Sequence, residues 1–203
     1  MTIRPNEEWG TEVTRPDGLV IAADDAALAA ALADRDAGPI AVGGGDLART
    51  LGARPIADRT VLRAFPIDLL RVQLDDDRVI PAIAHVVVRR PWSRGGWWRG
   101  PVTLVMNAEF LGEWDVATRG HPNDGRVERF DLDPTTGVRQ RRAIARRLPN
   151  GSHLPHPAIT RTTKRRHELA YDRPVAVIVD GVARGPSRAI SIQVDADAAT
   201  LYA

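Results

Sequence analysis

The sequence contains no cysteine and no long apolar run. Without cysteine, neither disulfide bonds nor thiolate metal sites can form, and a reducing cytoplasm is the compartment that fits best. The longest apolar stretches, such as residues 79–88, are far too short to cross a bilayer. The first ten residues also lack the apolar segment of a signal peptide. We therefore expect a soluble cytoplasmic protein that is at most peripheral to a membrane.

The composition is that of an ordinary globular chain, with 43% hydrophobic residues among 203. This is enough to bury a hydrophobic core without disulfide bonds. The formal net charge is only +2, but the charges are unevenly spread, because residues 139–166 are rich in Arg, Lys and His and contain no acid. A local basic surface is therefore more informative than the global balance.

Residues 18–52 alternate between strand and helix patterns. An apolar run at 18–23 predicts a strand, and the alanine-rich segment that follows predicts a helix with an Asp N-cap and a Gly end. Residues 39–42 predict a second strand, and GGGDLARTLG at 43–52 predicts a glycine turn opening a short helix. Strand, helix, strand, helix implies a parallel pair of strands.

After about residue 60 the pattern changes to short β-branched strands separated by Asp, Gly and Pro turns, with one helix near 136–148. Such spacing indicates an antiparallel sandwich or barrel. The predicted class is α+β, with an arm at 1–17, a small α/β part at 18–58 and a β-rich domain at 59–203.

The glycine turn is the first candidate site. Gly43, Gly44 and Gly45, followed by Asp46 at a helix N-terminus, would gather backbone N–H groups and the positive helix end at one point, which suits an anion. The alternative is a tight turn in which Asp46 serves as the N-cap, since glycine motifs are promiscuous.

Several further motifs, in the same order, resemble the bacterial diacylglycerol-kinase-like lipid kinases. They are MNAEFLGEWDVATRGHPNDGRVERFDL, GSHLPHPAI and VAVIVDGVARGPSRAISIQVDADAATLYA, and GGGDLARTLG is similar to the family's G-T-x-N-D-x-A-R motif. The resemblance covers residues 18–203. It implies the family's C-terminal β-domain, preceded by a shortened nucleotide domain whose first strands and helices would have to lie before Gly18.

The resemblance also places the family's GGDGT phosphate loop at VIAADDAAL. Asp25 then falls on the motif's Asp, while Asp24, Ala26 and Ala27 replace two glycines and the threonine. Glycines let phosphates approach the backbone, whereas a Cβ fills that space. A carboxylate a few ångströms from phosphate charge costs on the order of a few kcal/mol. We therefore predict that the phosphate-binding loops, from Asp25 to Asp46, are degenerate and that no cofactor is bound.

Two aspartates in turns are implied by the same resemblance as site residues. Asp180 stands in the family's DGE turn, where Val182 replaces the acidic residue, and it is the candidate catalytic residue. Asp124, in a Pro-x-x-Asp-Gly-like turn, is the candidate metal ligand, although a magnesium site usually takes more than one carboxylate. Both precede a glycine, so hairpin turns without chemistry are the open alternative. His153 and His156 have a metal-like spacing, but without a third ligand loop histidines are favoured.

A lipid or anion surface is the last candidate. Arg139, Arg142 and Arg146 on the predicted helix, with Trp97 and Trp98, could lie against anionic headgroups, each charge contributing about 1 kcal/mol. A solvated basic face, a core-covering tryptophan cluster or an interface with a second protomer are the alternatives. Nucleic acid is not expected, because no recognised motif accompanies the basic residues.

The favoured function is non-catalytic, with the chain binding a lipid or a protein partner in a pseudokinase-like role. The alternative is an active lipid kinase whose nucleotide site, with ATP and Mg²⁺, is completed by a partner or second protomer. A purely structural interaction module, or a homodimer formed through the tryptophans, is a third class.

Overall fold

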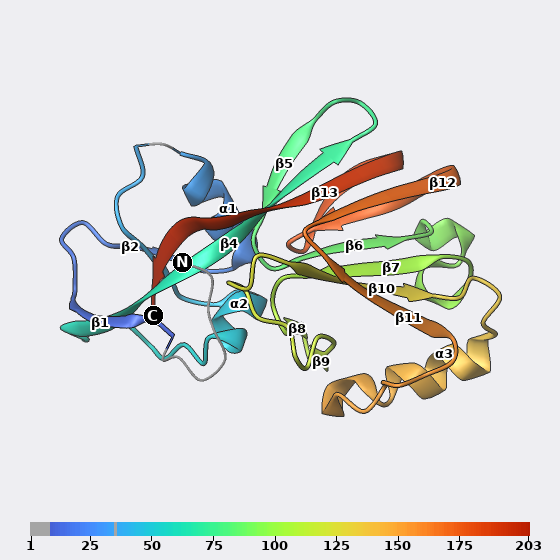
Figure 1. The fold of residues 1–203 in the computed structure, drawn as a ribbon, viewed down its shortest axis with the longest axis horizontal. Coiled ribbons are helices and arrows are strands. Elements are labelled where there is room, and N and C mark those ends of the chain that lie inside the picture. The colour runs from blue at the N-terminus through green and yellow to red at the C-terminus, as the bar shows by residue number, and fades with distance from the viewer. Residues whose placement is uncertain (1–8, 35) are drawn as a thin grey trace.

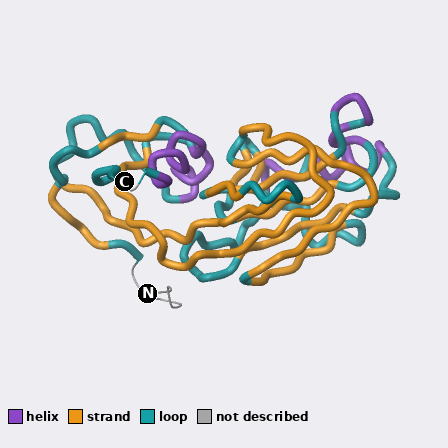
Figure 2. The backbone as a smooth tube through the Cα atoms, turned by 90° about the horizontal axis from the view of Figure 1, so that it is seen from above, coloured by secondary structure: helices purple, strands orange, loops and turns teal. Residues whose placement is uncertain are grey.

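The computed structural model describes residues 9–34 and 36–203, which form one large, mostly antiparallel sheet with a few short helices on one side of it (Figures 1 and 2). The prediction of a β-rich chain with few helices is confirmed. The helices are α1 (Asp25–Ala33), α2 (Gly45–Thr50) and α3 (Val138–Ala145), with 3-10 turns η1 (Trp92–Arg94), η2 (Gly96–Trp98) and η3 (Leu148–Asn150).

Eleven strands share the main sheet, and two short ones form a separate hairpin. The strands are β1 (Thr11–Thr14), β2 (Val20–Ala22), β3 (Ile40–Val42), β4 (Val61–Leu74), β5 (Val79–Ala82), β6 (His85–Arg89), β7 (Val102–Met106), β8 (Phe110–Leu111), β9 (Trp114–Asp115), β10 (Val127–Leu132), β11 (Ile159–Lys164), β12 (Arg166–Val179) and β13 (Val182–Tyr202). The main order is β1-β4-β13-β12-β6-β7-β10-β11, and β8 pairs with β9.

The first part of the chain has the order strand, helix, strand, helix. β2 and β3 are parallel, as a crossover through α1 requires, and β3 also lies parallel to the end of β13. The descent of this part from a nucleotide-binding domain stays a prediction. β1 pairs with β4 and lies inside the segment predicted as an arm, whose residues 1–8 lie outside the described residues.

Two long strands replace pairs of predicted short ones. β13 continues through an irregularity between Asp195 and Ala199, and β12 does so between Ala170 and Val175. Such bulges absorb extra residues, so the turn-like sequences at these points do not end the strands. Conversely, the apolar stretch at residues 79–88 does not form one strand but is divided into β5 and β6 by a break at residues 83–84.

The sheet curls around its own core. Apolar side chains of one face, contributed by β4, β5, β6, β7, β10, β12 and β13, meet in one cluster that includes Val72, Val105 and Ile192. A second cluster joins α1 and α2 to β4 and β13, and a third packs the other face of β7 and β10 toward the α3 region. The helices therefore cover two separate stretches of one face, α1 with α2 at one end and α3 at the other (Figure 2).

Among the described residues, no helix combines the length and the apolar character that a transmembrane span requires.

Candidate functional site

The stretch predicted to replace the phosphate loop forms the first turn of α1. Asp24 is the N-cap, with extended backbone (φ −154°), and its Oδ1 accepts the N–H of Ala27 at 2.8 Å. An N-cap carboxylate satisfies a helix donor that would otherwise be available to an external anion. The side chain at position 24 therefore supplies the negative group at this helix end.

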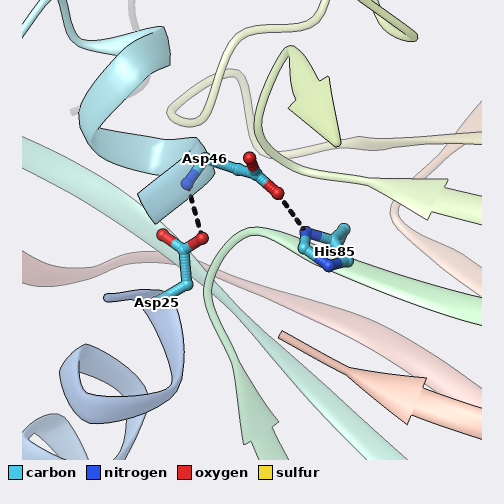
Figure 3. A group of neighbouring side chains, drawn as sticks. All are labelled: Asp25, Asp46 and His85. Atoms are coloured by element: carbon cyan, nitrogen blue, oxygen red, sulfur yellow. Dashed lines mark hydrogen bonds and ion pairs between the residues drawn. The ribbon is translucent and has the colours of Figure 1, made fainter. Parts of the chain in front are cut away.

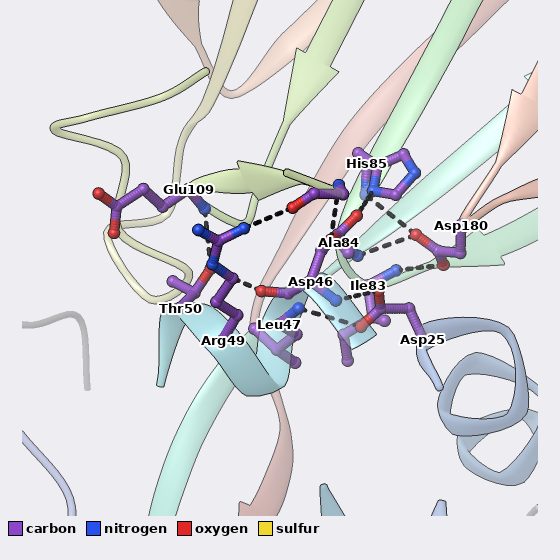
Figure 4. Close-up of polar contacts among 11 residues, drawn as sticks. Asp25, Asp46, Leu47, Arg49, Thr50, Ile83, Ala84, His85, Glu109 and Asp180 are labelled. Atoms are coloured by element: carbon purple, nitrogen blue, oxygen red, sulfur yellow. Dashed lines mark hydrogen bonds and ion pairs between the residues drawn. The ribbon is translucent and has the colours of Figure 1, made fainter. Parts of the chain in front are cut away.

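Asp25 reaches from the start of α1 to the start of α2. Its Oδ2 accepts the N–H of Asp46 at 2.6 Å and its Oδ1 accepts the N–H of Leu47 at 3.1 Å (Figures 3 and 4). These are the backbone donors that the glycine turn was predicted to offer to an anion. In this chain a carboxylate of the protein itself receives them.

The glycines before α2 allow a close approach of backbone segments. A Cβ on Gly43 would lie 2.7 Å from the carbonyl oxygen of Ala22, and one on Gly44 would lie 2.4 Å from that of Ala23. Side chains cannot be accommodated at these distances. The glycines at 43 and 44 are therefore explained by the packing of the segment after β3 against the segment after β2, with no bound phosphate required.

These contacts decide how well a nucleotide would fit. The N–H groups of residues 46 and 47 are engaged by Asp25, and the glycine backbone lies against residues 22–23. A phosphate placed at the start of α2 would have to displace a carboxylate and would meet the charge of Asp46 beside it. The residues present do not fit nucleotide phosphates at this point.

Asp180 lies close to the same site and anchors the break between β5 and β6. Its carboxylate accepts three backbone N–H groups, those of Ile83 at 2.8 Å, Ala84 at 3.0 Å and His85 at 2.9 Å (Figure 4). The residue has a positive φ of 46° at the turn into β13. Burial raises its pKa to about 7, against the lowering effect of the three N–H bonds, and the charge of Asp25 adds to the rise.

His85 completes a group of three side chains from three separate elements. It begins β6, is buried, and places Nδ1 3.4 Å from Oδ2 of Asp46 (Figure 3). Burial lowers the pKa of His85, although Asp46 opposes the shift, while burial raises the pKa of Asp25 to about 6. Asp25, Asp46 and His85 each offer one ligand atom, and the three atoms lie within 4.8 Å of one another.

The sequence identified Asp25, Asp46 and Asp180 as separate candidate site residues, and in the structure they lie close together (Figure 4). The sequence analysis did not identify His85, which appears in the sequence only as a single histidine inside the apolar run AIAHVVV. Asp68, which accepts the N–H groups of Gly125 at 2.7 Å and Asp197 at 2.8 Å, was missed in the same way, as one carboxylate within FPIDLL.

Asp124, the predicted metal ligand, lies elsewhere. Its Oδ1 accepts the N–H of Arg126 at 2.8 Å, as expected of a turn residue, and burial raises its pKa. In the described part of the chain it does not belong to any group of three metal-ligating side chains within 4.8 Å. Its role as a ligand stays a prediction.

A cavity of about 230 Å³ lies between α3, the tryptophan turns and the sheet. Four of the five tryptophans line it, Trp92, Trp97, Trp98 and Trp114, together with aliphatic residues that include Leu104 and Ile144. One edge carries His153, which is 2% exposed and whose ring nitrogens make no hydrogen bond within residues 9–34 and 36–203. Burial lowers the pKa of His153, and the nearby Val116 backbone and Asp115 oppose the shift without reaching hydrogen-bond geometry.

Part of the predicted lipid surface lies at this cavity, because Trp97 and Trp98 line it. Arg139 and Arg142 are exposed on α3, Arg146 is exposed directly after it, and the guanidinium of Arg142 lies 5.8 Å from the ring centre of Trp98. Trp98 is 39% exposed and Trp92 is 64% exposed. The basic helix and the tryptophans are therefore neighbours in space, although about forty residues separate them in the sequence.

Arg141 belongs to the same helix but has a different role. It is buried, and its guanidinium donates to the carbonyl oxygens of Thr136 at 2.9 Å, Trp97 at 2.8 Å and Gly100 at 2.5 Å. These bonds attach α3 to the tryptophan turns. Burial lowers the pKa of Arg141, with the neighbouring positive charge of Arg90 acting in the same direction.

No protein-family model matches the sequence, and no curated protein matches it. Solved structures do. One described as a putative diacylglycerol kinase from Bacillus anthracis str. Sterne aligns with a TM-score of 0.63 at 12% identity, over 90% of this chain and 76% of that one. Another diacylglycerol kinase structure from the same organism gives a TM-score of 0.60 at 12% identity, over 90% and 74%. The resemblance read from the motifs is thus confirmed at the level of structure: this chain has the fold of these bacterial diacylglycerol kinases.

Proposed function

We propose that this chain is a lipid-binding protein that has the lipid-kinase fold without phosphoryl-transfer activity. The observation that carries the proposal is the apolar cavity walled by four tryptophans, one of which, Trp98, lies next to the exposed Arg142 of α3. An apolar pocket beside a cationic surface suits an amphipathic molecule with a hydrocarbon part and an anionic head.

The size of the cavity limits what it can hold. An apolar cavity of about 150 Å³ in another protein is dry and accepts benzene, and most ligand pockets begin at about 300 Å³. At about 230 Å³, the cavity fits a ring or part of one aliphatic chain. We therefore propose that it takes a segment of a single acyl chain while the rest of the lipid stays outside.

The charges at the rim favour an anionic headgroup. Arg139 and Arg142 are exposed on α3 and Arg146 is exposed directly after it, and each cation near an anionic surface contributes about 1 kcal/mol. Together they would supply about 3 kcal/mol, which corresponds to about a hundredfold in affinity at low salt. Exposed Trp92 and Trp98 supply the amphipathic rings that favour a headgroup interface.

The absence of phosphoryl transfer is proposed from the carboxylates at the glycine turn. Asp24 caps α1 and Asp25 caps α2, so the two helix N-termini in this region already carry internal anions. A kinase completed by a second chain is the alternative, and it would require these contacts to open.

The cavity is tested with a pair of tryptophan substitutions on one helix. Ala145 lines the cavity, whereas Ala143 is exposed on α3 and does not. We expect Ala145→Trp to weaken binding of a fluorescent fatty acid by at least tenfold, and Ala143→Trp to leave it within twofold. Equal affinities for the two variants would refute binding in the cavity.

The contribution of the exposed arginines in and after α3 is tested by binding to lipid vesicles. A variant in which Arg139, Arg142 and Arg146 are changed to Gln should lose most of its binding to vesicles containing phosphatidylglycerol at low salt. Arg54→Gln, an exposed change beyond the far helix α2, is the matched control and should bind normally. A wild-type protein without a salt-sensitive preference for anionic over neutral vesicles would exclude the membrane part of the proposal.

Calorimetric titration with ATP, with and without Mg²⁺, separates the proposal from the kinase alternative. We expect no heat of binding up to millimolar ATP. Micromolar binding by the isolated chain would instead favour an active kinase.

A further inference from the structure

A cluster of potential metal ligands lies between the N-termini of α1 and α2 and the start of β6, outside the lining of the tryptophan cavity. Asp25 begins α1, Asp46 lies in the first turn of α2 and His85 begins β6. One oxygen or nitrogen atom from each lies within 4.8 Å of the other two (Figure 3). Asp25 and His85 are buried, and Asp46 is partly buried.

The imidazole of His85 provides an observation independent of the acidic residues. His85 is 3% exposed, and its Nδ1 has no hydrogen-bond partner in the described chain. Buried polar atoms normally have a partner, and one that lacks it needs an explanation. This atom faces Oδ2 of Asp46 at 3.4 Å, as Figure 3 shows. A cation between the two atoms would satisfy both.

The charges around the cluster also favour a bound cation. Asp25, Asp46 and Asp180 are three carboxylates gathered at one place (Figure 4). Within the described ranges, none of them forms an ion pair with a lysine or arginine side chain. Buried carboxylates without a cationic partner are costly, and a divalent ion is the smallest group that balances them.

The protein already holds the ligands in position. Asp180 accepts the N–H of His85 at 2.9 Å and so fixes the start of β6, and Asp46 Oδ1 accepts the N–H of Gly112 at 2.8 Å. Asp25 is fixed by the N–H groups of α2. Each carboxylate oxygen has a second lone pair that these bonds leave available. Such outer contacts are what orients ligands in metal sites.

The donor set selects the class of ion. Imidazole is a ligand that zinc and other first-row transition-metal ions favour, and these ions also bind carboxylate oxygen. Mg²⁺ instead prefers six oxygen ligands in an octahedral arrangement. Two ligands at about 2.0–2.1 Å from a tetrahedral zinc are about 3.4 Å apart, which matches the 3.4 Å between His85 and Asp46. We propose that Asp25, Asp46 and His85 bind one divalent first-row transition-metal ion. This site is independent of the proposed lipid cavity, so either proposal can fail without the other.

The test uses the full chain, freed of metal with a chelator and titrated with Zn²⁺ in a calorimeter. We expect one Zn²⁺ per chain, at least tenfold weaker binding in His85→Gln and in Asp46→Asn, and unchanged binding in His156→Gln. His156 serves as the control because it is a loop histidine outside the cluster whose Nδ1 accepts the N–H of Ala158. Circular dichroism of the metal-free variants checks that they fold.

Absence of Zn²⁺ binding at micromolar concentration, or full binding in both cluster variants, would overturn the proposal. Binding of Mg²⁺ in preference to Zn²⁺ would overturn the assignment to a transition metal. If the variants do not fold, the X-ray absorption spectrum of the wild-type zinc complex decides. We expect nitrogen or oxygen neighbours at about 2.0–2.1 Å that include one imidazole, and a spectrum without imidazole would contradict the site.

Discussion

At the scale of single residues, aspartates tie loops together by accepting backbone N–H groups. Asp24 caps α1, Asp25 caps α2, and Asp180 holds the break between β5 and β6. Hydrogen bonds from backbone N–H to an ionised carboxylate are among the stronger ones in proteins. Residues that resemble a kinase's site residues therefore have a structural function that holds without any substrate.

Gly45 is a position where this network constrains the sequence. Its φ is +96°, and a Cβ there would lie 2.5 Å from Oδ1 of Asp25. We expect Gly45→Ala to lower the free energy of unfolding by at least about 2 kcal/mol, because it combines backbone strain with displacement of a buried carboxylate. Urea denaturation followed by circular dichroism measures the change.

Gly52→Ala separates the two causes. Gly52 also has a positive φ, +62°, but no atom lies within 4 Å of a Cβ added there. This variant should lose only about 1 kcal/mol, the cost of a positive φ in a non-glycine residue. Equal losses at the two glycines would show that the carboxylate of Asp25 does not occupy the position described.

The sequence predicted the residues of this network better than their contacts. The run AADDAAL carries a visible N-cap signal. The bond from Asp25 to residues 46 and 47 spans more than twenty positions, however, and no local pattern encodes it. His85 and Asp68 escaped notice because a single polar residue within an apolar strand gives no indication of its partner.

At the scale of elements, α3 depends on its surroundings. It has only eight residues, and an isolated helix of that length is unstable in water. The sequence predicted a helix near 136–148, and α3 lies within that range. The sequence could not show which of the arginines in this helix is buried. Arginines at neighbouring positions lie on several faces of the helix, and nothing in the local pattern distinguishes the buried one from the exposed ones. The structure assigns that position to Arg141.

Replacing Arg141 with Lys tests the attachment of α3. A lysine keeps the charge but cannot reproduce three bonds to the carbonyls of residues 97, 100 and 136. We expect a loss of about 2–3 kcal/mol in the free energy of unfolding, since buried carbonyls and a buried charge lose their partners. Thermal and urea denaturation measure it.

Arg142→Lys is the matched control for this prediction. Arg142 is exposed on the same helix and contacts only the ring of Trp98 among the contacts described. Its replacement should change stability by no more than about 0.5 kcal/mol, as surface substitutions usually do. A comparable loss in both variants would mean that the buried hydrogen bonds of Arg141 are not what holds the helix.

At the scale of the whole molecule, the two parts expected from the sequence share one sheet. β4 and β13 pair along most of their lengths, and β13 continues beyond its irregularity to lie beside β3 (Figure 1). The sequence suggested a change of architecture near residue 58, because local patterns differ on the two sides. It could not show this continuity, since a bulge within a long strand resembles a turn between two short ones.

The shared sheet leads to a prediction about unfolding. Tryptophan fluorescence reports mainly on the α3 end, where four of the five tryptophans lie, and amide exchange in β3 reports on the other end. Because β13 belongs to both ends, we expect the two probes to give the same free energy of unfolding, as in a two-state transition. A chain that begins at residue 59 should not fold stably, since Phe65, Ile67 and Leu201 would lose the cover of α1, α2 and β3. Exchange in β3 through a separate, lower-energy opening, together with a stably folded shortened chain, would instead show two independent domains.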